Sequence, residues 1–252
     1  MASALAVIPA RFASSRFPGK PLADETGKPL IQHVVERVQQ AQRLDRVVVA
    51  TDDPRIFDAV TAFGAEAVMT GEHPNGTSRI AEAVATLGSG HDLIVNVQGD
   101  EPEVPAETID ALIDGLDGDA EAQMATLASP FAEDEDTTNP NVVKLVLDQR
   151  GRAMYFSRSP IPFDREAERL GHRPTATLYK HPGLYAYRRS FLEVYPTLEP
   201  TPLEQAEQLE QLRVLERGYA IKIVHAPAPH PGIDTPEQYA AFVERVKSGQ
   251  AG

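Results

Sequence analysis

Three groups of residues could do chemistry on a phosphate, and the first is segment 8–22, Ile-Pro-Ala-Arg-Phe-Ala-Ser-Ser-Arg-Phe-Pro-Gly-Lys-Pro-Leu. Its small residues would let backbone N–H groups approach an anion, and Arg11, Arg16 and Lys20 would supply positive charge. The segment contains neither GxxxxGK[ST] nor GxGxxG. It therefore predicts a polyphosphate site of another kind, with a solvated basic loop as the alternative.

Two aspartates form the other groups. Asp100 lies in Asn-Val-Gln-Gly-Asp-Glu-Pro, residues 96–102, and Asp234 lies in Gly-Ile-Asp-Thr-Pro, residues 232–236. A carboxylate at the end of a strand that faces bound phosphates is what Mg²⁺ needs to bridge protein and nucleotide. The alternative interpretations are an ordinary turn for Asp100 and a position beside a helix N-cap for Asp234. The sequence leaves open whether the two aspartates meet.

The elements that must position these residues alternate in the first half of the chain. Apolar runs predict buried strands, and a stripe formed by Ile31, Val34, Val35 and Val38 predicts an amphipathic helix. The strands expected are 5–8, 47–50, 67–69 and 93–97, and the helices are 31–38, 56–63, 80–87 and 108–116. Buried strands that alternate with helices indicate a mainly parallel sheet covered on both faces. Segment 8–22 and Asp100 would then lie at the carboxyl edge of the sheet, where ligands bind.

After about residue 120 this alternation weakens. Strands are expected at 124–127, 142–147, 154–156, 184–187 and 221–224, a polar surface loop at 164–177 and one helix over 203–217. Thr235 and Pro236 are the residue types of a helix N-cap and first helical position. The predicted fold class is therefore α/β, a mainly parallel central sheet flanked by helices with an antiparallel extension.

Composition excludes several classes of function. The chain has 252 residues, a formal net charge of −13 and no cysteine. Disulfides, thiolate metal sites and a cysteine nucleophile are therefore excluded. The acidic balance excludes a general basic surface for nucleic acid or for an anionic membrane. No apolar run approaches the roughly 18 residues of a membrane-spanning helix, and the chain does not start with a signal peptide, so the cytoplasm is the expected location.

Ten short motifs, in order from about residue 5 to residue 245, resemble those of the 3-deoxy-manno-octulosonate cytidylyltransferase (CMP-KDO synthetase) family. Each motif is weak to moderate alone, but the collinear set is highly specific. They are Ile-Pro-Ala-Arg (8–11), Ser-Arg-Phe-Pro-Gly-Lys-Pro-Leu (15–22), Val-Ala-Thr-Asp (49–52), Gly-Thr (76–77), Asn-Val-Gln-Gly-Asp-Glu-Pro (96–102), Tyr-Phe-Ser-Arg (155–158), Tyr-Lys-His (179–181), Gly-Leu-Tyr-Ala-Tyr (183–187), Leu-Glu-Gln-Leu-Arg (209–213) and Asp-Thr-Pro (234–236).

The resemblance implies one nucleotidyltransferase domain over residues 1–252 with a glycosyltransferase-A-like fold. Its part up to about residue 120 would bind nucleotide, and its part from about 121 would bind sugar and form a homodimer. The implied reaction couples CTP to 3-deoxy-D-manno-octulosonate (KDO) and gives CMP-KDO and pyrophosphate for lipopolysaccharide synthesis. Arg11, Arg16 and Lys20 fall on the triphosphate-binding positions, with Lys20 the most sensitive. Asp100 and Asp234 fall on the carboxylates that hold Mg²⁺, and Asp100 is counted with the catalytic residues.

The resemblance also implies a set of substrate-binding residues, among which Arg79 suits a bidentate contact with the sugar carboxylate. As alternatives, His181 and Tyr185 could be structural, and Glu210 and Gln211 could lie on a solvated helix face. The full set is Ala10, Ser15, Gly76, Thr77, Arg79, Gln98, Arg158, His181, Tyr185, Glu210 and Gln211.

Departures from the family pattern cluster around the expected sugar pocket. Ser78 stands where an acidic residue is usual, Pro182 where an aliphatic residue is usual, and Pro74 and Asn75 also differ. An 8-amino analogue of KDO or a sialic acid therefore stays an alternative substrate. A non-catalytic nucleotide-binding protein is a further alternative, which the presence of Lys20 and both aspartates disfavours.

Overall fold

Strands and helices alternate through the first half of the chain, as expected. The structure, a computed structural model, describes residues 1–14, 16–73, 75–171, 177–227 and 232–250. The elements of this half are β1 (Ala4–Ala10), the short 3₁₀ helix η1 (Lys20–Leu22), α1 (Leu30–Val38), β2 (Arg46–Thr51), α2 (Pro54–Ala62), β3 (Glu66–Met69), α3 (Gly76–Leu87), β4 (Leu93–Asn96) and α4 (Ala106–Asp117).

The second half contains more strands and shorter helices. These elements are β5 (Ala122–Pro130), β6 (Lys144–Leu147), β7 (Ala153–Ser157), α5 (Arg165–Leu170), β8 (Tyr179–Lys180), β9 (Tyr185–Arg188), α6 (Arg189–Val194), η2 (Tyr195–Thr197), α7 (Pro202–Glu207), α8 (Gln211–Glu216), β10 (Ala220–His225) and α9 (Pro236–Lys247). None of the helices within the described ranges is long and apolar enough to cross a membrane.

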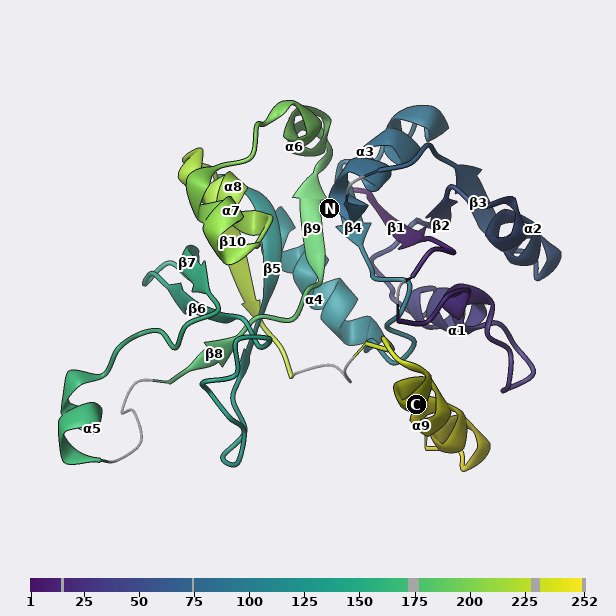
Figure 1. Cartoon of the computed structure of the whole chain (residues 1–252). Coiled ribbons are helices and arrows are strands. Elements are labelled where there is room, and N and C mark those ends of the chain that lie inside the picture. The colour runs from purple at the N-terminus through teal and green to yellow at the C-terminus, as the bar shows by residue number, and fades with distance from the viewer. Residues whose placement is uncertain (15, 74, 172–176, 228–231, 251–252) are drawn as a thin grey trace.

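The described strands form one sheet in the order β3-β2-β1-β4-β9-β5-β8-β6-β7, with β10 paired to β5 (Figure 1). Strands β3, β2, β1 and β4 are parallel to one another, and β9 pairs antiparallel with both β4 and β5. Strands β8, β6 and β7 continue the sheet in antiparallel pairs. The predicted α/β class with an antiparallel extension is confirmed.

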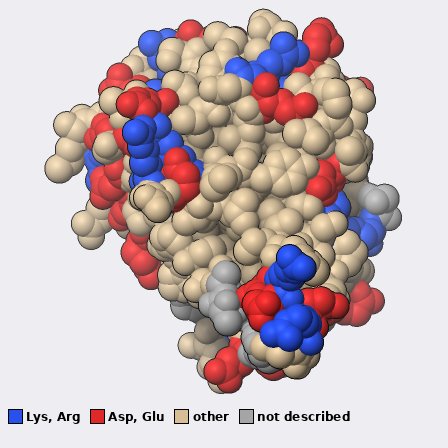
Figure 2. Space-filling model, turned by 90° about the vertical axis from the view of Figure 1, so that its left-hand side faces the viewer, with Lys and Arg blue, Asp and Glu red and all other residues tan. Residues whose placement is uncertain are grey.

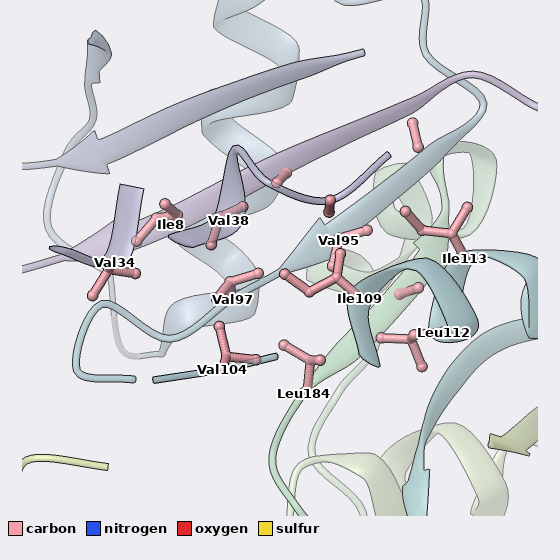
Figure 3. Close-up of a cluster of buried hydrophobic side chains, with 14 of the residues drawn as sticks. Ile8, Val34, Val38, Val95, Val97, Val104, Ile109, Leu112, Ile113 and Leu184 are labelled. Carbon is pink, nitrogen blue, oxygen red and sulfur yellow. The ribbon is translucent and has the colours of Figure 1, made fainter. Parts of the chain in front are cut away.

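The hydrophobic core forms two layers, one on each face of the sheet, and successive side chains of β1 point alternately into one layer and the other. Ala4, Ala6 and Ile8 pack on the face covered by α1, α2 and α4, whereas Leu5 and Val7 pack on the face covered by α3, α6 and α8. Figure 3 shows part of the first layer, where Ile8 and Val95 from the strands meet side chains of α1 and α4. Because β1 is buried on both faces, its backbone is a rigid support for the loop that follows it.

Helix α9 packs separately, against the start of α1. Tyr239, Phe242 and Val243 of α9 form a small apolar cluster with Leu30 of α1 and Ile233 just before α9. Thr235 is the N-cap, as expected: its side chain accepts a hydrogen bond from the Gln238 N–H, and Gln238 reaches back to the cap. This packing fixes the segment that contains Asp234.

The expectation of one helix over 203–217 is wrong. The chain forms α7 and α8 instead, because Gln208 adopts the left-handed conformation (φ 55°) and ends α7. A left-handed residue breaks the helical hydrogen-bond ladder, and the Gln208 carbonyl accepts a hydrogen bond from Arg158 instead. The break places Leu209 and Glu210 between two short helices.

The expectation of a polar loop over 164–177 is wrong in part, since α5 occupies Arg165–Leu170. The Asp164 side chain caps the Ala167 N–H, Glu166 and Glu168 lie in the first turn, and Gly171 ends the helix in the left-handed conformation. A helix of six mostly exposed residues leaves no apolar period in the sequence. Residues 172–176 of the same expectation lie outside the described residues.

Candidate active site

The carboxyl ends of β1, β2 and β4 meet at one edge of the sheet, and a cavity of about 380 Å³ opens there. The loops that follow β1 and β4 form two of its walls, and the start of α3 forms a third. Its lining residues are Pro9, Ala10, Arg11, Ser14, Arg16, Lys20, Pro21, His73, Asn75, Gly76, Arg79, Gln98, Gly99, Asp100, Glu210 and Asp234. We call this space the cationic cavity.

The loop after β1 is closed by a glycine turn. Gly19 has φ +74°, and its N–H donates to the Phe12 carbonyl over 3.0 Å. A Cβ at Gly19 would lie 3.0 Å from the Phe12 ring, so a side chain there is disfavoured by both conformation and space. The turn directs the next residue, Lys20, into η1 and toward the cavity.

A second glycine brings the loop after β4 against β1. A Cβ at Gly99 would lie 2.8 Å from the Pro9 carbonyl oxygen, a distance that real Cβ atoms essentially never show. Only glycine therefore allows the Gln98–Asp100 turn to approach the end of β1 this closely. The same approach places the Asp100 side chain beside Lys20.

Lys20 is the centre of a charged cluster. Its Nζ lies 2.7 Å from Asp100 Oδ2, 3.5 Å from Asp234 Oδ1 and 2.5 Å from the Ile233 carbonyl oxygen. The Lys20 side chain is only 11% exposed. Arg16 Nη2 lies 3.0 Å from the other Asp234 oxygen, Oδ2. Residues from the two ends of the chain therefore converge on one point, as the resemblance requires.

A backbone hydrogen bond joins the two aspartate-bearing segments. The Ile233 N–H donates to the Asp100 carbonyl over 2.8 Å, and the Ile233 side chain is buried against α9 and α1. The position of Asp234 therefore depends on the packing of α9. Because this contact is between backbone groups, it does not depend on the charges of the neighbouring side chains.

The two aspartates fit a divalent cation shared with a nucleotide. Mg²⁺ in nucleotide sites binds one or two carboxylates, together with phosphate oxygens and water. Within the described residues, no group of three or more His, Cys, Asp or Glu side chains could hold a metal alone. Glu101 adds little further charge at neutral pH, because burial raises the pKa of its carboxyl to about 8.

A second cavity, of about 360 Å³, adjoins the cationic cavity and shares Gly76, Gln98 and Glu210 with it. Its other lining residues are Thr77, Asn96, Met124, Gly183, Tyr185, Tyr187, Tyr195, Gln208, Leu209, Gln211 and Val214. We call it the tyrosine cavity. Its hydroxyl and amide groups suit a polyhydroxylated ligand better than an apolar one.

Glu210 lies between the two cavities. Its Oε2 accepts hydrogen bonds from Thr77 Oγ1 (3.2 Å) and from the Tyr195 hydroxyl (3.4 Å). Burial raises the pKa of the Glu210 carboxyl, although both hydrogen bonds oppose this shift. The side chain projects from the short connection between α7 and α8, so the break at Gln208 is what presents it to the site.

His181 is held in one tautomer. The Thr126 hydroxyl lies 2.8 Å from both the Leu184 carbonyl and His181 Nε2. Since the hydroxyl hydrogen is directed to the carbonyl, the hydrogen of the second bond comes from Nε2. His181 Nδ1 is then an acceptor, with the Gln211 amide nitrogen 3.4 Å away. Burial lowers the pKa of the imidazole to about 3, so the ring is neutral at physiological pH.

Comparisons with known proteins show the family to which the chain belongs. A family model described as cytidylyltransferase matches residues 5–223. The chain is 51% identical over 248 residues to a 3-deoxy-manno-octulosonate cytidylyltransferase of Syntrophobacter fumaroxidans, covering 98% of each chain. It is also 51% identical over 239 residues to the enzyme of that name from Syntrophotalea carbinolica, covering 93% and 95% of the two chains. The chain belongs to the 3-deoxy-manno-octulosonate cytidylyltransferase family.

A solved structure of this family has the same fold. It is CMP:2-keto-3-deoxy-manno-octonic acid synthetase complexed with CTP, and it superposes with a TM-score of 0.91 at 43% identity. The match covers 98% of this chain and 99% of that one. A cytidylyltransferase is a nucleotidyltransferase, so this chain is an enzyme of that class.

The structure brings most of the family's expected site residues to the two cavities. Ala10, Arg11, Arg16, Lys20, Arg79, Asp100 and Asp234 line the cationic cavity, and Thr77, Tyr185 and Gln211 line the tyrosine cavity. Gly76, Gln98 and Glu210 line both. His181 lies directly behind Gln211 and Tyr185, and Ser15 lies outside the described residues. Their roles stay predictions.

Arg79 already has a carboxylate partner in this cytidylyltransferase. Its Nη2 lies 2.6 Å from Asp52 Oδ2 and its Nη1 lies 2.8 Å from Thr70 Oγ1, with 4% of the residue exposed. It lines the cationic cavity and not the tyrosine cavity. The direct contact of Arg79 with the sugar carboxylate stays a prediction. It would either add to the ion pair with Asp52 or replace it.

Arg158 lies outside both cavities. Its guanidinium donates to the carbonyl oxygens of Glu207 (2.7 Å), Pro140 (3.0 Å) and Gln208 (3.3 Å). It therefore fastens the end of α7 to β7 and holds the connection that presents Glu210. This geometry supports a positioning role rather than the predicted direct contact with substrate.

Asn96, Tyr187 and Tyr195 line the tyrosine cavity although the sequence did not single them out as substrate-binding. For two of these residues, the sequence contains a feature that could have predicted a place in the site. Asn96 is a polar residue inside an otherwise apolar strand, and Tyr187 lies two residues after Tyr185, on the same face of β9. Tyr195 belongs to η2, and its approach depends on packing that no local pattern reveals.

Proposed function

We propose that this chain couples CTP to 3-deoxy-D-manno-octulosonate and releases pyrophosphate, as a step in lipopolysaccharide synthesis. The observation that carries the proposal is the convergence of Lys20, Arg16, Asp100 and Asp234 in the cationic cavity, which adjoins the hydroxyl-rich tyrosine cavity. The anomeric hydroxyl of the sugar acid would attack the α-phosphorus in line, with pyrophosphate as the leaving group.

The cationic cavity would hold the triphosphate. Arg11, Arg16 and Lys20 provide three positive charges there, and Gly99 permits the backbone of the β4 loop to approach closely. Charge grows on the phosphate oxygens as the bond to pyrophosphate breaks, so cations already in place lower the barrier without reorganising. Mg²⁺ held by Asp100 and Asp234 would supply further positive charge to the phosphate oxygens.

The tyrosine cavity would hold the sugar acid. Tyr185, Gln211 and the Glu210 carboxylate offer donors and acceptors for several hydroxyl groups. His181 stays neutral and orients Gln211, because its Nδ1 accepts from the Gln211 amide. Glu210 lies at the shared wall, where the sugar and the α-phosphate would meet.

Pyrophosphate release tests this proposal directly. Native protein with Mg²⁺, CTP and KDO should release pyrophosphate, and Asp100→Asn should release at least about a hundredfold less, because the Mg²⁺ that would neutralise negative charge on the phosphate oxygens loses a carboxylate ligand. Asp110→Asn, which alters an aspartate on α4 away from both cavities, is the control. Release with the 8-amino analogue or a sialic acid but not with KDO would overturn the substrate assignment.

We further propose that the enzyme acts as a homodimer in the cytoplasm. Strand β7 ends the sheet and exposes Met154 (62%), and the segment between β7 and α5, which together with α5 we call the α5 arm, exposes Phe163 (75%). Figure 2 shows this side of the molecule, where a broad uncharged area separates charged groups at the margins. An exposed strand edge with apolar side chains suits pairing with a second copy.

A further inference from the structure

The strongest unexplained feature of the site is that its two aspartates are already neutralised. Asp100 Oδ2 and Asp234 Oδ1 both contact the Lys20 ammonium, and Asp234 Oδ2 contacts the Arg16 guanidinium. Two carboxylates thus face two cations, and the four charges sum to zero. A cavity proposed to hold a divalent cation shows no surplus negative charge among these four groups.

The Lys20 contact is stronger than an ordinary surface ion pair. The Lys20 side chain is 11% exposed, and the three donors of its ammonium are taken by the two aspartates and by the Ile233 carbonyl at 2.5 Å. Charge-assisted hydrogen bonds in a partly desolvated site are worth more than solvated ones. A metal ion that needs the same carboxylate oxygens must compete with this ammonium.

We propose that Lys20, assisted by Arg16, is a built-in counter-cation that blocks metal binding until a nucleoside triphosphate arrives. The inference rests on the proposed function, since it takes the aspartates as metal ligands. The phosphates offer Lys20 and Arg16 alternative anionic partners, and the aspartates then lose their cations. Triphosphate and divalent cation therefore bind cooperatively, and each raises the affinity for the other by the same factor.

The flexible lysine stem makes this exchange possible. Lysine presents a compact charge on four methylene groups, so a small rotation moves the ammonium from carboxylate to phosphate. The segments of the two aspartates also have contacts that do not involve Lys20, namely the Ile233–Asp100 backbone hydrogen bond and the packing of Ile233 against α9. Removing the lysine should therefore leave the metal ligands in place.

Binding of Mn²⁺ to nucleotide-free protein, followed by the electron paramagnetic resonance signal of the free ion, tests this. Lys20→Met should bind Mn²⁺ on the order of tenfold more tightly than native protein, because one competing positive charge is gone. Arg16→Gln should bind a few-fold more tightly, a smaller gain because the Arg16 side chain is 64% exposed. Lys28→Met removes one positive charge from an exposed pair with Glu36 and should change nothing.

Two further measurements separate the possible failures. Adding Asp100→Asn to Lys20→Met should abolish the gain, which places the Mn²⁺ at the aspartates. Absence of pyrophosphate release from native protein with Mg²⁺, CTP and KDO overturns the proposed function alone. Unchanged or weaker Mn²⁺ binding in both Lys20→Met and Arg16→Gln overturns the counter-cation inference alone. Should Lys20→Met unfold, Arg16→Gln alone decides.

Discussion

His181 illustrates how neighbouring groups set the chemistry of one side chain. Thr126 receives the hydrogen of Nε2, Gln211 donates to Nδ1, and Phe156 packs edge-on against the ring at a centroid distance of 4.9 Å. A protonated imidazole would place a second donor opposite the Gln211 amide and a charge among aromatic rings. The neutral form is therefore built into the packing.

This arrangement predicts a pH dependence of stability. The pKa of His181 is lowered from 6.5 to about 3, so between these values the unfolded chain binds a proton that the folded chain refuses. Stability must then fall as the pH falls through this window. The Tm of native protein should decrease more steeply from pH 6.5 to pH 4 than the Tm of His181→Gln. His225→Gln, which removes an exposed imidazole, serves as the control, and parallel profiles for native protein and His181→Gln would refute the assignment.

At the residue scale, the sequence predicts which side chains belong to the site better than it predicts the groups that each side chain contacts. Lys20, Asp100 and Asp234 can be identified from residue type and motif, and they meet in the structure. The Asp52 partner of Arg79 and the carbonyl partners of Arg158 cannot, because these contacts depend on how separate loops fold back. An arginine can form hydrogen bonds with many different groups, so its residue type alone does not specify which group it contacts in the fold.

Among the elements, α9 has the clearest functional consequence. It lies outside the two main core layers, and its apolar contacts are those with Leu30, Ile233 and nearby residues. Elements with few buried contacts open more readily than the central strands do. The position of Asp234 should therefore be more sensitive to mutation than the position of Asp100.

Phe242→Ala tests this expectation. Phe242 is 1% exposed, and truncating a buried phenylalanine costs about 3–5 kcal/mol. Amide hydrogen exchange should accelerate through α9 while the amides of β1 keep their protection, and pyrophosphate release should fall. Glu244→Ala, at an exposed position of α9, should leave both unchanged. Equal loss of protection in α9 and β1 would mean that the helix is part of the main cooperative unit.

The accuracy of sequence-based prediction differs between elements for a physical reason. The strands of the first half and α1, α2 and α4 are buried on a regular face, so their apolar periods mark them. The helices α5 and α7 are six residues long and are set by caps and by a left-handed residue, which periodicity does not register. β8, of two residues, is defined only by its pairing with β5 and β6.

For the whole molecule, the two ends of the sheet differ in what they expose. β3 forms one edge and β7 the other (Figure 1). A methionine is exposed on each strand, Met69 at 41% and Met154 at 62%. The β7 edge continues into the α5 arm and its exposed Phe163, whereas the β3 edge is followed by the loop to α3. The proposed dimer uses the β7 edge.

Light scattering on a size-exclusion column tests the dimer. Native protein should have twice the 27.4 kDa mass of one chain, and Met154→Glu should shift it to a single chain by placing a charge in the interface. The same substitution at the opposite edge, Met69→Glu, should leave the mass unchanged. A native mass of one chain, or dissociation by both variants, would rule out this interface.

The hydrogen bond from Ile233 to Asp100 has a consequence for how the protein is made. Translation delivers Lys20 and Asp100 to the ribosome exit long before Asp234 and α9 emerge. A nascent chain can thus assemble its sheet and still hold an unfinished reaction centre. Catalytic activity would be acquired only when α9 has emerged from the ribosome. Products that stop before Asp234 would therefore fold in large part but would not release pyrophosphate.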